Sequence, residues 1–369
     1  MVFRIERRPP PGFLASFGVV LAALALGMLA GGLLFAVKGI DPFTALWKIF
    51  QGSFGSSFGL KDTVTKAIPL ILIGAGLCLA FRGRIWNIGA EGQLLAGAIG
   101  ASGVALYGTP FLPEWAVLPA MFLAGAIGGA AWAWFPAVCR IRWGMNETIT
   151  TLMLNYVAAE LVQFLIYGPW KGKSQFGFPY TDDFAACATL PTLYGSRIHW
   201  PTLALGVATA LALALLVSRS RFGFEVRVVG ENPEAAHYAG MDRGRVVLLV
   251  MLVSGALAGL AGVGEVAGIH RHLSAPASIS SGYGFTAIIT AYLARLHPVA
   301  VIFTSLFFGG LLVGGDVIQT SLGLPFATVH IFNGMILFAL LVGDFLLDHR
   351  VRRVGELPAA PPAPASEAA

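Results

Sequence analysis

Long apolar stretches separated by short polar segments dominate the pattern of this chain. About twenty consecutive apolar residues are enough for one helix to cross the hydrocarbon core of a membrane. The pattern predicts such helices over 13–37, 63–81, 86–107, 115–139, 148–167, 201–217, 246–269, 298–313 and 326–347. We therefore predict an all-α integral membrane protein, with residues 13–347 as its membrane domain.

Residues 274–295 do not fit this pattern. Gly282, Tyr283, Gly284 and Phe285 precede a short apolar run that ends at Ala294. The segment forms either a thin span or a re-entrant pair, and irregular backbone of this kind is tolerated only where protein covers it or it lines a cavity. A thin span gives about ten transmembrane helices, with broken or re-entrant segments among them, and places both termini on the same side.

The polar segments between these stretches differ in length and character. Residues 1–12 are predicted to be a cytoplasmic N-terminus, and 168–199 an ordered loop on the outer side. Residues 219–245 form the largest cytoplasmic loop. Residues 348–369 are predicted to be a cytoplasmic tail, disordered where it is rich in proline and alanine.

Composition and charge support a membrane protein. Hydrophobic residues make up 56% and charged residues 12%, which is about half the usual charged share. Of 24 Lys and Arg residues, 16 fall in the segments predicted to be cytoplasmic, where positive charge accumulates. The net charge of +5 thus reflects topology, and we expect no nucleic-acid partner.

The sequence carries no signature of catalysis. It has no GxxxxGK[ST] loop, so we expect any ATP to be bound by another subunit. It has no HExxH motif, and its three cysteines lie far apart without CxxC spacing. We therefore predict neither an enzyme nor a metal site, and no cofactor of its own.

The loop 219–245 contains a predicted short helix. Asn232 is a good helix N-cap, and Pro233 at the first helical position loses no needed N–H. Glu234 favours the positive end of the helix dipole, and Gly240 is a natural stop. This pattern is typical of a capped helix at the membrane surface, on which a separate motor protein can push.

Polar and aromatic residues within or beside the spans are candidates for a substrate pathway, because a polar group in lipid is costly. The candidates are Asn87, Glu91, Gln93, Asn146, Glu147, Asn155, Tyr283, Phe285 and Asn333. Two interpretations remain open: they line a cavity, or they form hydrogen bonds between packed helices and cap helix starts. Asn155 shares a helix face with Thr148 and Thr151, which fits a cavity wall or a helix contact.

Four stretches together resemble the permease subunits of nucleoside-type ABC importers, a group similar to the permeases for simple sugars and branched-chain amino acids. They are Ala80-Phe81-Arg82 with Trp86-Asn87-Ile88-Gly89-Ala90-Glu91-Gly92-Gln93, Gly144-Met145-Asn146-Glu147-Thr148-Ile149 with Thr151-Leu152-Met153-Leu154-Asn155-Tyr156, Gly282-Tyr283-Gly284-Phe285-Thr286-Ala287-Ile288, and Asn333-Gly334-Met335-Ile336. The resemblance extends from about Gly39 to Asp344 and implies an ABC-importer permease fold.

The predicted surface helix also resembles the EAA–x3–G signature of such permeases. Its residues are Asn232, Pro233, Glu234, Ala235, Ala236 and Gly240. The usual apolar continuation after the glycine is replaced by Met241-Asp242-Arg243-Gly244. The resemblance implies that this helix docks in a cleft of the ATPase and couples ATP hydrolysis to transport.

The same resemblance implies the partners and the location. They are an ABC ATPase subunit, a second permease subunit that is identical or related, an extracytoplasmic substrate-binding protein and the lipid bilayer of a bacterial cytoplasmic (inner) membrane. The solute would be a nucleoside or a related nucleobase-containing compound. Polar residues such as Asn155 and Glu91 suit sugar hydroxyl groups equally well, so a simple-sugar permease is the nearest alternative.

An alternative from another class is a secondary transporter driven by an ion gradient. Glu91 and Glu265 lie within predicted spans and Asp316 lies just past one, and acidic residues in such positions often bind ions or protons. Such a protein would work alone, without an ATPase.

Overall fold

The computed structural model describes residues 2–7, 13–174 and 176–354. It divides into two compact units, one of residues 1–46 with 325–369 and one of residues 47–324. The described chain is mostly helical, and each unit has a packed interior of its own.

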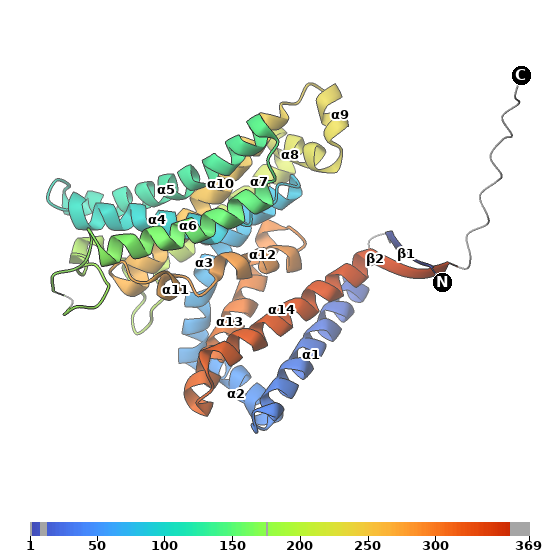
Figure 1. Ribbon diagram of the computed structural model, residues 1–369, viewed down its shortest axis with the longest axis horizontal. Helices are drawn as coiled ribbons and strands as arrows, with labels where there is room; N and C mark the ends of the chain where they lie inside the picture. Colours follow the sequence, from blue (N-terminus) through green and yellow to red (C-terminus); the bar gives the residue numbers. More distant parts are fainter. Residues whose placement is uncertain (1, 8–12, 175, 355–369) are drawn as a thin grey trace, which may run out of the picture. The chain divides into compact units, whose positions relative to one another are not determined.

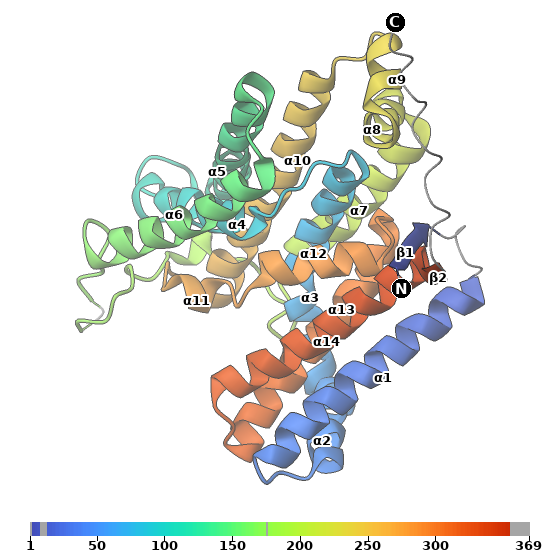
Figure 2. The same cartoon turned by 45° about the vertical axis from the view of Figure 1, so that its right-hand side comes forward.

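In the first unit, helices α1 (Phe13–Val37) and α14 (Phe326–Asp348) lie side by side (Figures 1 and 2). The rings of Phe35 and Phe332 stand 5.1 Å apart at this contact. A Cβ atom on Gly31 would come within 2.2 Å of the Phe332 ring, so only glycine permits the two helices to approach so closely.

A two-stranded antiparallel sheet joins the ends of this unit. Strand β1 (Val2–Arg7) pairs with β2 (His349–Val354), with Val2 opposite Val354 and Arg7 opposite His349. The prediction of an all-α chain therefore does not hold at 349–354, because that segment finds a strand partner more than 340 residues away in sequence. The rest of the predicted tail, 355–369, lies outside the described residues, as do 8–12.

The second unit is a bundle of helices. Its elements are α2 (Pro42–Phe54, which begins in the first unit), α3 (Ser57–Arg82), α4 (Ala90–Gly103) extended by the π-helical turn η1 (Val104–Gly108), α5 (Glu114–Trp143), α6 (Glu147–Tyr167), the 3₁₀ turn η2 (Ala186–Ala188), α7 (Trp200–Arg219), α8 (Arg221–Glu231), α9 (Pro233–Tyr238), α10 (Arg243–Gly264) extended by the π-helical turn η3 (Glu265–His270), α11 (Pro276–Ile279), α12 (Tyr283–Leu293) and α13 (Pro298–Leu322).

Among the described residues, six helices are long and apolar enough to cross a membrane. They are Ser57–Arg82, Glu114–Trp143, Glu147–Tyr167, Trp200–Arg219, Arg243–His270 and Pro298–Leu322. The predicted count of about ten spans is thus not confirmed by length and composition. The predicted boundaries are mostly within a few residues of the helices, but α13 continues nine residues past the predicted end at Val313.

Helix α3 lies at the centre of this bundle, buried along most of its length against α10, α12 and α13. Close backbone contacts between α4, α5 and α10 depend on glycine. A Cβ atom on Gly259 would lie 2.1 Å from the carbonyl oxygen of Gly125. Small residues are what allows membrane helices to pack this tightly.

Helix α12 forms the second part of the segment 274–295 and runs alongside α3. Its first residue, Tyr283, lies beside Lys66 of α3, with the Lys66 Nζ 5.9 Å from the ring centroid. Past its last residue, the carbonyl oxygen of Leu296 accepts a hydrogen bond from Arg82 Nε at 2.9 Å. Lys66 and Arg82 are separated by roughly 24 Å along the α3 axis at 1.5 Å per residue. Residues 283–296 thus advance along α3 in one direction.

The loop 168–199 forms backbone hydrogen bonds with residues at and just after η3. Backbone N–H groups of Thr181, Phe184 and Leu190 donate to carbonyls of Leu273, Arg271 and Ala267. The loop therefore packs onto the end of η3 and closes one end of the bundle.

Candidate functional site

The predicted surface helix is present as α9. The side chain of Asn232 accepts hydrogen bonds from the backbone N–H groups of Glu234 (3.1 Å) and Ala235 (3.0 Å). Pro233 occupies the first helical position. Gly240 has a φ of +73°, a conformation that favours glycine, and the chain turns there toward α10. The local sequence thus fixes both ends of the helix.

Helix α9 projects from the bundle. All six of its residues are described, and Ala236 alone is buried, with 1% of its surface exposed. Tyr238 is 91% exposed. In Figures 1 and 2, α8 and α9 lie together beyond the ends of α7 and α10. A helix of this kind offers nearly its whole surface to another protein.

Helix α8, which the sequence analysis did not predict, anchors α9 to the bundle. Val226, Val229 and Gly230 are buried on one face. A Cβ atom on Gly230 would lie 2.1 Å from the carbonyl oxygen of Arg82, so α8 packs directly on the end of α3. The signal was available: Ser220 caps α8 by accepting from Gly223 N at 2.9 Å, and valines three residues apart follow.

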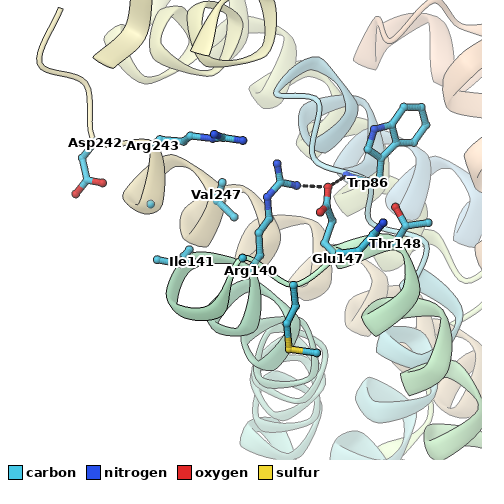
Figure 3. A pocket seen from close by; sticks show the side chains of 12 residues that line it. Trp86, Arg140, Ile141, Glu147, Thr148, Asp242, Arg243 and Val247 are labelled. Carbon is cyan, nitrogen blue, oxygen red and sulfur yellow. Dashed lines mark hydrogen bonds and ion pairs between the residues drawn. The ribbon is translucent and has the colours of Figure 1, made fainter. Parts of the chain in front are cut away.

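A cavity of about 910 Å³ lies at the same end of the bundle, near the start of α10. Figure 3 shows the guanidinium of Arg140 paired with the carboxylate of Glu147, which also accepts from the backbone N of Trp86 at 3.3 Å. Asn146 caps α6 by accepting from Thr148 N at 2.9 Å. Two predicted pathway residues, Asn146 and Glu147, therefore lie together at this cavity, where α5 ends and α6 begins.

Three other predicted residues, Asn87, Gln93 and Asn155, make buried hydrogen bonds, and together with Ser254 and Thr151 they form what we call the amide network. The side-chain amides of Asn87 and Gln93 each donate a hydrogen bond to the other's oxygen at 2.9 Å. The Asn87 amide also donates to Ser254 Oγ at 3.0 Å.

The network also holds the backbone of the connection between α3 and α4. Asn155 accepts from Gly92 N at 2.8 Å and donates to the Ile88 carbonyl at 3.0 Å. The Thr151 hydroxyl accepts from Ile88 N at 3.2 Å. These bonds tie the segment 87–92 to α6 and α10.

The remaining predicted residues are dispersed. The Glu91 carboxylate accepts from Gly284 N at 2.8 Å, which links the start of α4 to the start of α12. Phe285 is 43% exposed and lines neither of the two cavities described here. Asn333 belongs to α14 in the first unit, and its side chain lies outside the described residues.

A second cavity of about 400 Å³, which we call the charged cavity, lies between α3, η3, α12 and α13. The charged side chains at its wall are Asp62, Lys66, Arg197, Glu265 and Asp316. Lys66 Nζ lies 3.4 Å from Asp316 Oδ2, and Tyr283 faces the same space. Within the described ranges, no three His, Cys, Asp or Glu side chains gather closely enough to hold a metal ion.

Of the residues at the charged cavity, Tyr283 alone was predicted from the sequence as a pathway residue, while Glu265 and Asp316 were candidate ion sites of the alternative transporter. Lys66 was missed. A lysine nine residues inside the apolar helix that begins at Ser57 was the signal that could have found it.

Membrane-length helices, a projecting surface helix and a charged cavity among the helices together define a multi-pass membrane transport subunit. Residues 59–342 match the family model for the permease component of the branched-chain amino acid transport system. The chain therefore belongs to this family of ABC transporter permeases, and the resemblance to nucleoside-type permeases is confirmed.

Several relatives are similar over nearly their whole length. The glucose ABC transporter permease protein TsgB13 of Haloferax volcanii is 39% identical, over 96% of this chain and 95% of the relative. The guanosine ABC transporter permease protein NupP of Bacillus subtilis is 32% identical, over 86% and 91%. The nucleoside ABC transporter permease protein NupB of Lactococcus lactis is 31% identical, over 88% and 90%.

Proposed function

We propose that this chain is the membrane subunit of an ATP-driven importer and carries a nucleoside or related nucleobase-containing solute into the cell. The observation that carries the coupling role is the exposure of α9, a helix capped at both ends with Ala236 as its one buried side chain. A separate ATPase subunit that grips α9 would move α8 with it, and α8 rests on the end of α3. ATP then drives transport because the ATPase binds two permease states with different affinity.

The arginine residues support an orientation with α9 in the cytoplasm. Arg82 and Arg219 end α3 and α7, and Arg140 stands near Arg243 at the cavity between α5 and α10. Positive residues collect on the cytoplasmic side. We propose that α1, the η1-extended α4, α12 and α14 complete ten passes with the six membrane-length helices, with both termini in the cytoplasm of a bacterial-type cell.

The proposed function also implies partner proteins. A second permease subunit, identical or related, would complete the translocation path, and an extracytoplasmic binding protein would deliver solute to the end closed by residues 168–199. The named relatives are permease subunits, which supports a division of labour with a separate ATPase.

Charge reversal on α9 tests the coupling role. In the complete importer, Glu234→Arg should lower solute uptake at least about tenfold and abolish stimulation of ATP hydrolysis by the loaded binding protein, while the permease still reaches the membrane. Glu114→Arg is the matched control, because Glu114 is also an exposed acid in the first turn of a helix. Normal coupling in Glu234→Arg would refute the docking role.

A second candidate solute is a simple sugar, favoured by the 39% identity to a glucose permease. Competition for uptake distinguishes the nucleoside candidate from the sugar candidate. Uptake of labelled guanosine or uridine that unlabelled nucleosides suppress, and glucose does not, supports the first candidate. The reverse result identifies a sugar permease.

A further inference from the structure

We propose that the charged cavity is the chamber that holds the solute inside the membrane, with Lys66, Asp316 and Tyr283 as its contacts for an uncharged ring compound bearing hydroxyl groups. This inference rests on the proposed function, since it assigns a site to the solute of that importer. Most of the chamber wall comes from α3, η3, α12 and α13 of one compact unit, and Gly52, Arg197 and Ser278 also contribute to it.

The placement of Lys66 and Asp316 requires a polar environment. Both belong to membrane-length helices, and their side chains are 28% and 58% exposed. A charged side chain in contact with lipid at mid-membrane costs about 2.5–3.5 kcal/mol. Because their side chains meet at 3.4 Å across the charged cavity, we infer that this exposed surface faces water or solute and not lipid.

The balance of charges favours a neutral solute. The wall carries three acids, Asp62, Glu265 and Asp316, and two bases, Lys66 and Arg197. A carboxylate accepts hydrogen bonds from hydroxyl groups, and an ammonium donates to them. A wall with both kinds of group in close proximity offers hydrogen-bond donors and acceptors to the hydroxyl groups of a neutral polyol.

The Tyr283 side chain borders this polar space. Tyr283 is 4% exposed, and Lys66 Nζ lies 5.9 Å from its centroid. Its backbone N–H donates to Ser280 Oγ at 3.2 Å, which holds the start of α12 in place. Aromatic rings pack well against flat rings and sugar faces. The volume of about 400 Å³ lies within the range of small-molecule sites.

The competing interpretation is that Lys66 and Asp316 form only a structural ion pair between α3 and α13. Exchanging the two charges distinguishes a structural ion pair from a contact with solute. In the complete importer, Lys66→Met and Asp316→Asn should each raise the KM for uptake at least about tenfold. The double variant Lys66→Asp with Asp316→Lys keeps the ion pair, so it should keep the thermal stability and membrane level of the wild type but leave the KM raised. A double variant with wild-type KM would overturn the proposal.

Cysteine protection gives an independent readout that does not depend on transport. In a Cys187→Ser background, Thr320→Cys places a thiol on the wall of the charged cavity, and Ser321→Cys places one next to it outside the wall. Both positions are exposed. Saturating nucleoside or glucose, whichever the importer carries, should slow modification of Thr320→Cys by a methanethiosulfonate reagent several-fold and leave Ser321→Cys unchanged. Equal rates with and without solute at Thr320→Cys would overturn the proposal.

The experiments also separate this inference from the function on which it rests. If the wild-type importer carries neither nucleosides nor sugars, the proposed function and the chamber both fail. If wild-type uptake is robust while the Lys66 and Asp316 variants transport with unchanged KM, only the chamber fails.

Discussion

The amide network and the charged cavity are two polar regions of one helix bundle, and their side chains are used in opposite ways. In the amide network, Asn87, Gln93 and Asn155 are buried and bonded to one another or to backbone groups. In the charged cavity, Lys66 and Asp316 meet each other and still expose surface to open space. The first region is closed and the second is open.

The difference shows that polarity inside a membrane bundle does not by itself identify a substrate site. Amides that bond fully within the protein have the geometry of packing contacts, which is one of the two interpretations that the sequence left open. Charges that remain exposed within membrane-length helices need water or a ligand. The closed region should therefore govern stability, and the open region should govern transport.

The largest effect is expected from the amide network. Asn87→Leu leaves the Gln93 amide, the Ser254 hydroxyl and the Gly89 N–H without their partner. Each stranded buried group costs about 1–3 kcal/mol, so we expect a loss of about 3–5 kcal/mol in the free energy of unfolding. Thermal unfolding of the purified protein in detergent measures it. The exposed cap variant Asn146→Ala is the control and should lose only about 1 kcal/mol.

Acid should produce an intermediate effect through His199, at the start of α7. Burial against Gly264 and Gly268 lowers the pKa of His199 to about 4, and its Nε2 has no hydrogen-bond partner among the described residues. The unfolded chain binds the proton near pH 6.5, so the folded state is penalised as pH falls below 6.5 and the penalty is complete below pH 4.

This linkage predicts a loss of about 2 kcal/mol between pH 7 and pH 5. The measurement is the melting temperature across that range, compared with His199→Asn, which cannot titrate. A slope of equal size in the variant would contradict the assignment to His199.

The smallest effect on stability is expected in the charged cavity. Asp316→Asn removes the charge partner of Lys66, but both side chains are partly exposed. A pair of this kind contributes about 1 kcal/mol or less. We therefore expect a melting temperature close to the wild type together with the raised KM proposed above. A large destabilisation would place this pair with the amide network and remove the contrast between the two regions.

Much of the fold was readable from local sequence. Apolar stretches gave the helix boundaries to within a few residues, with α1 matching from Phe13 to Val37. Asn232, Pro233 and Gly240 gave both ends of α9, because caps and a positive φ are properties of neighbouring residues. Helix α8 was missed because its apolar face is short and lies among arginines.

Contacts between distant residues could not be read in this way. The pairing of β1 with β2 joins opposite ends of the chain, and the Lys66–Asp316 pair joins residues 250 apart. The sequence named Asn87, Gln93 and Asn155 as polar residues within spans, but not whether their partners would be protein or solute. That choice depends on which helices become neighbours.

The sequence by itself determined that this chain crosses a membrane, where most of its long helices begin and end, and that it carries a capped surface helix. These properties depend on hydrophobicity and on backbone groups a few residues apart. Only the tertiary structure decided which polar side chains are satisfied inside the protein and which face a cavity, because hydrogen-bond partners and cavities are made by elements brought together from all along the chain.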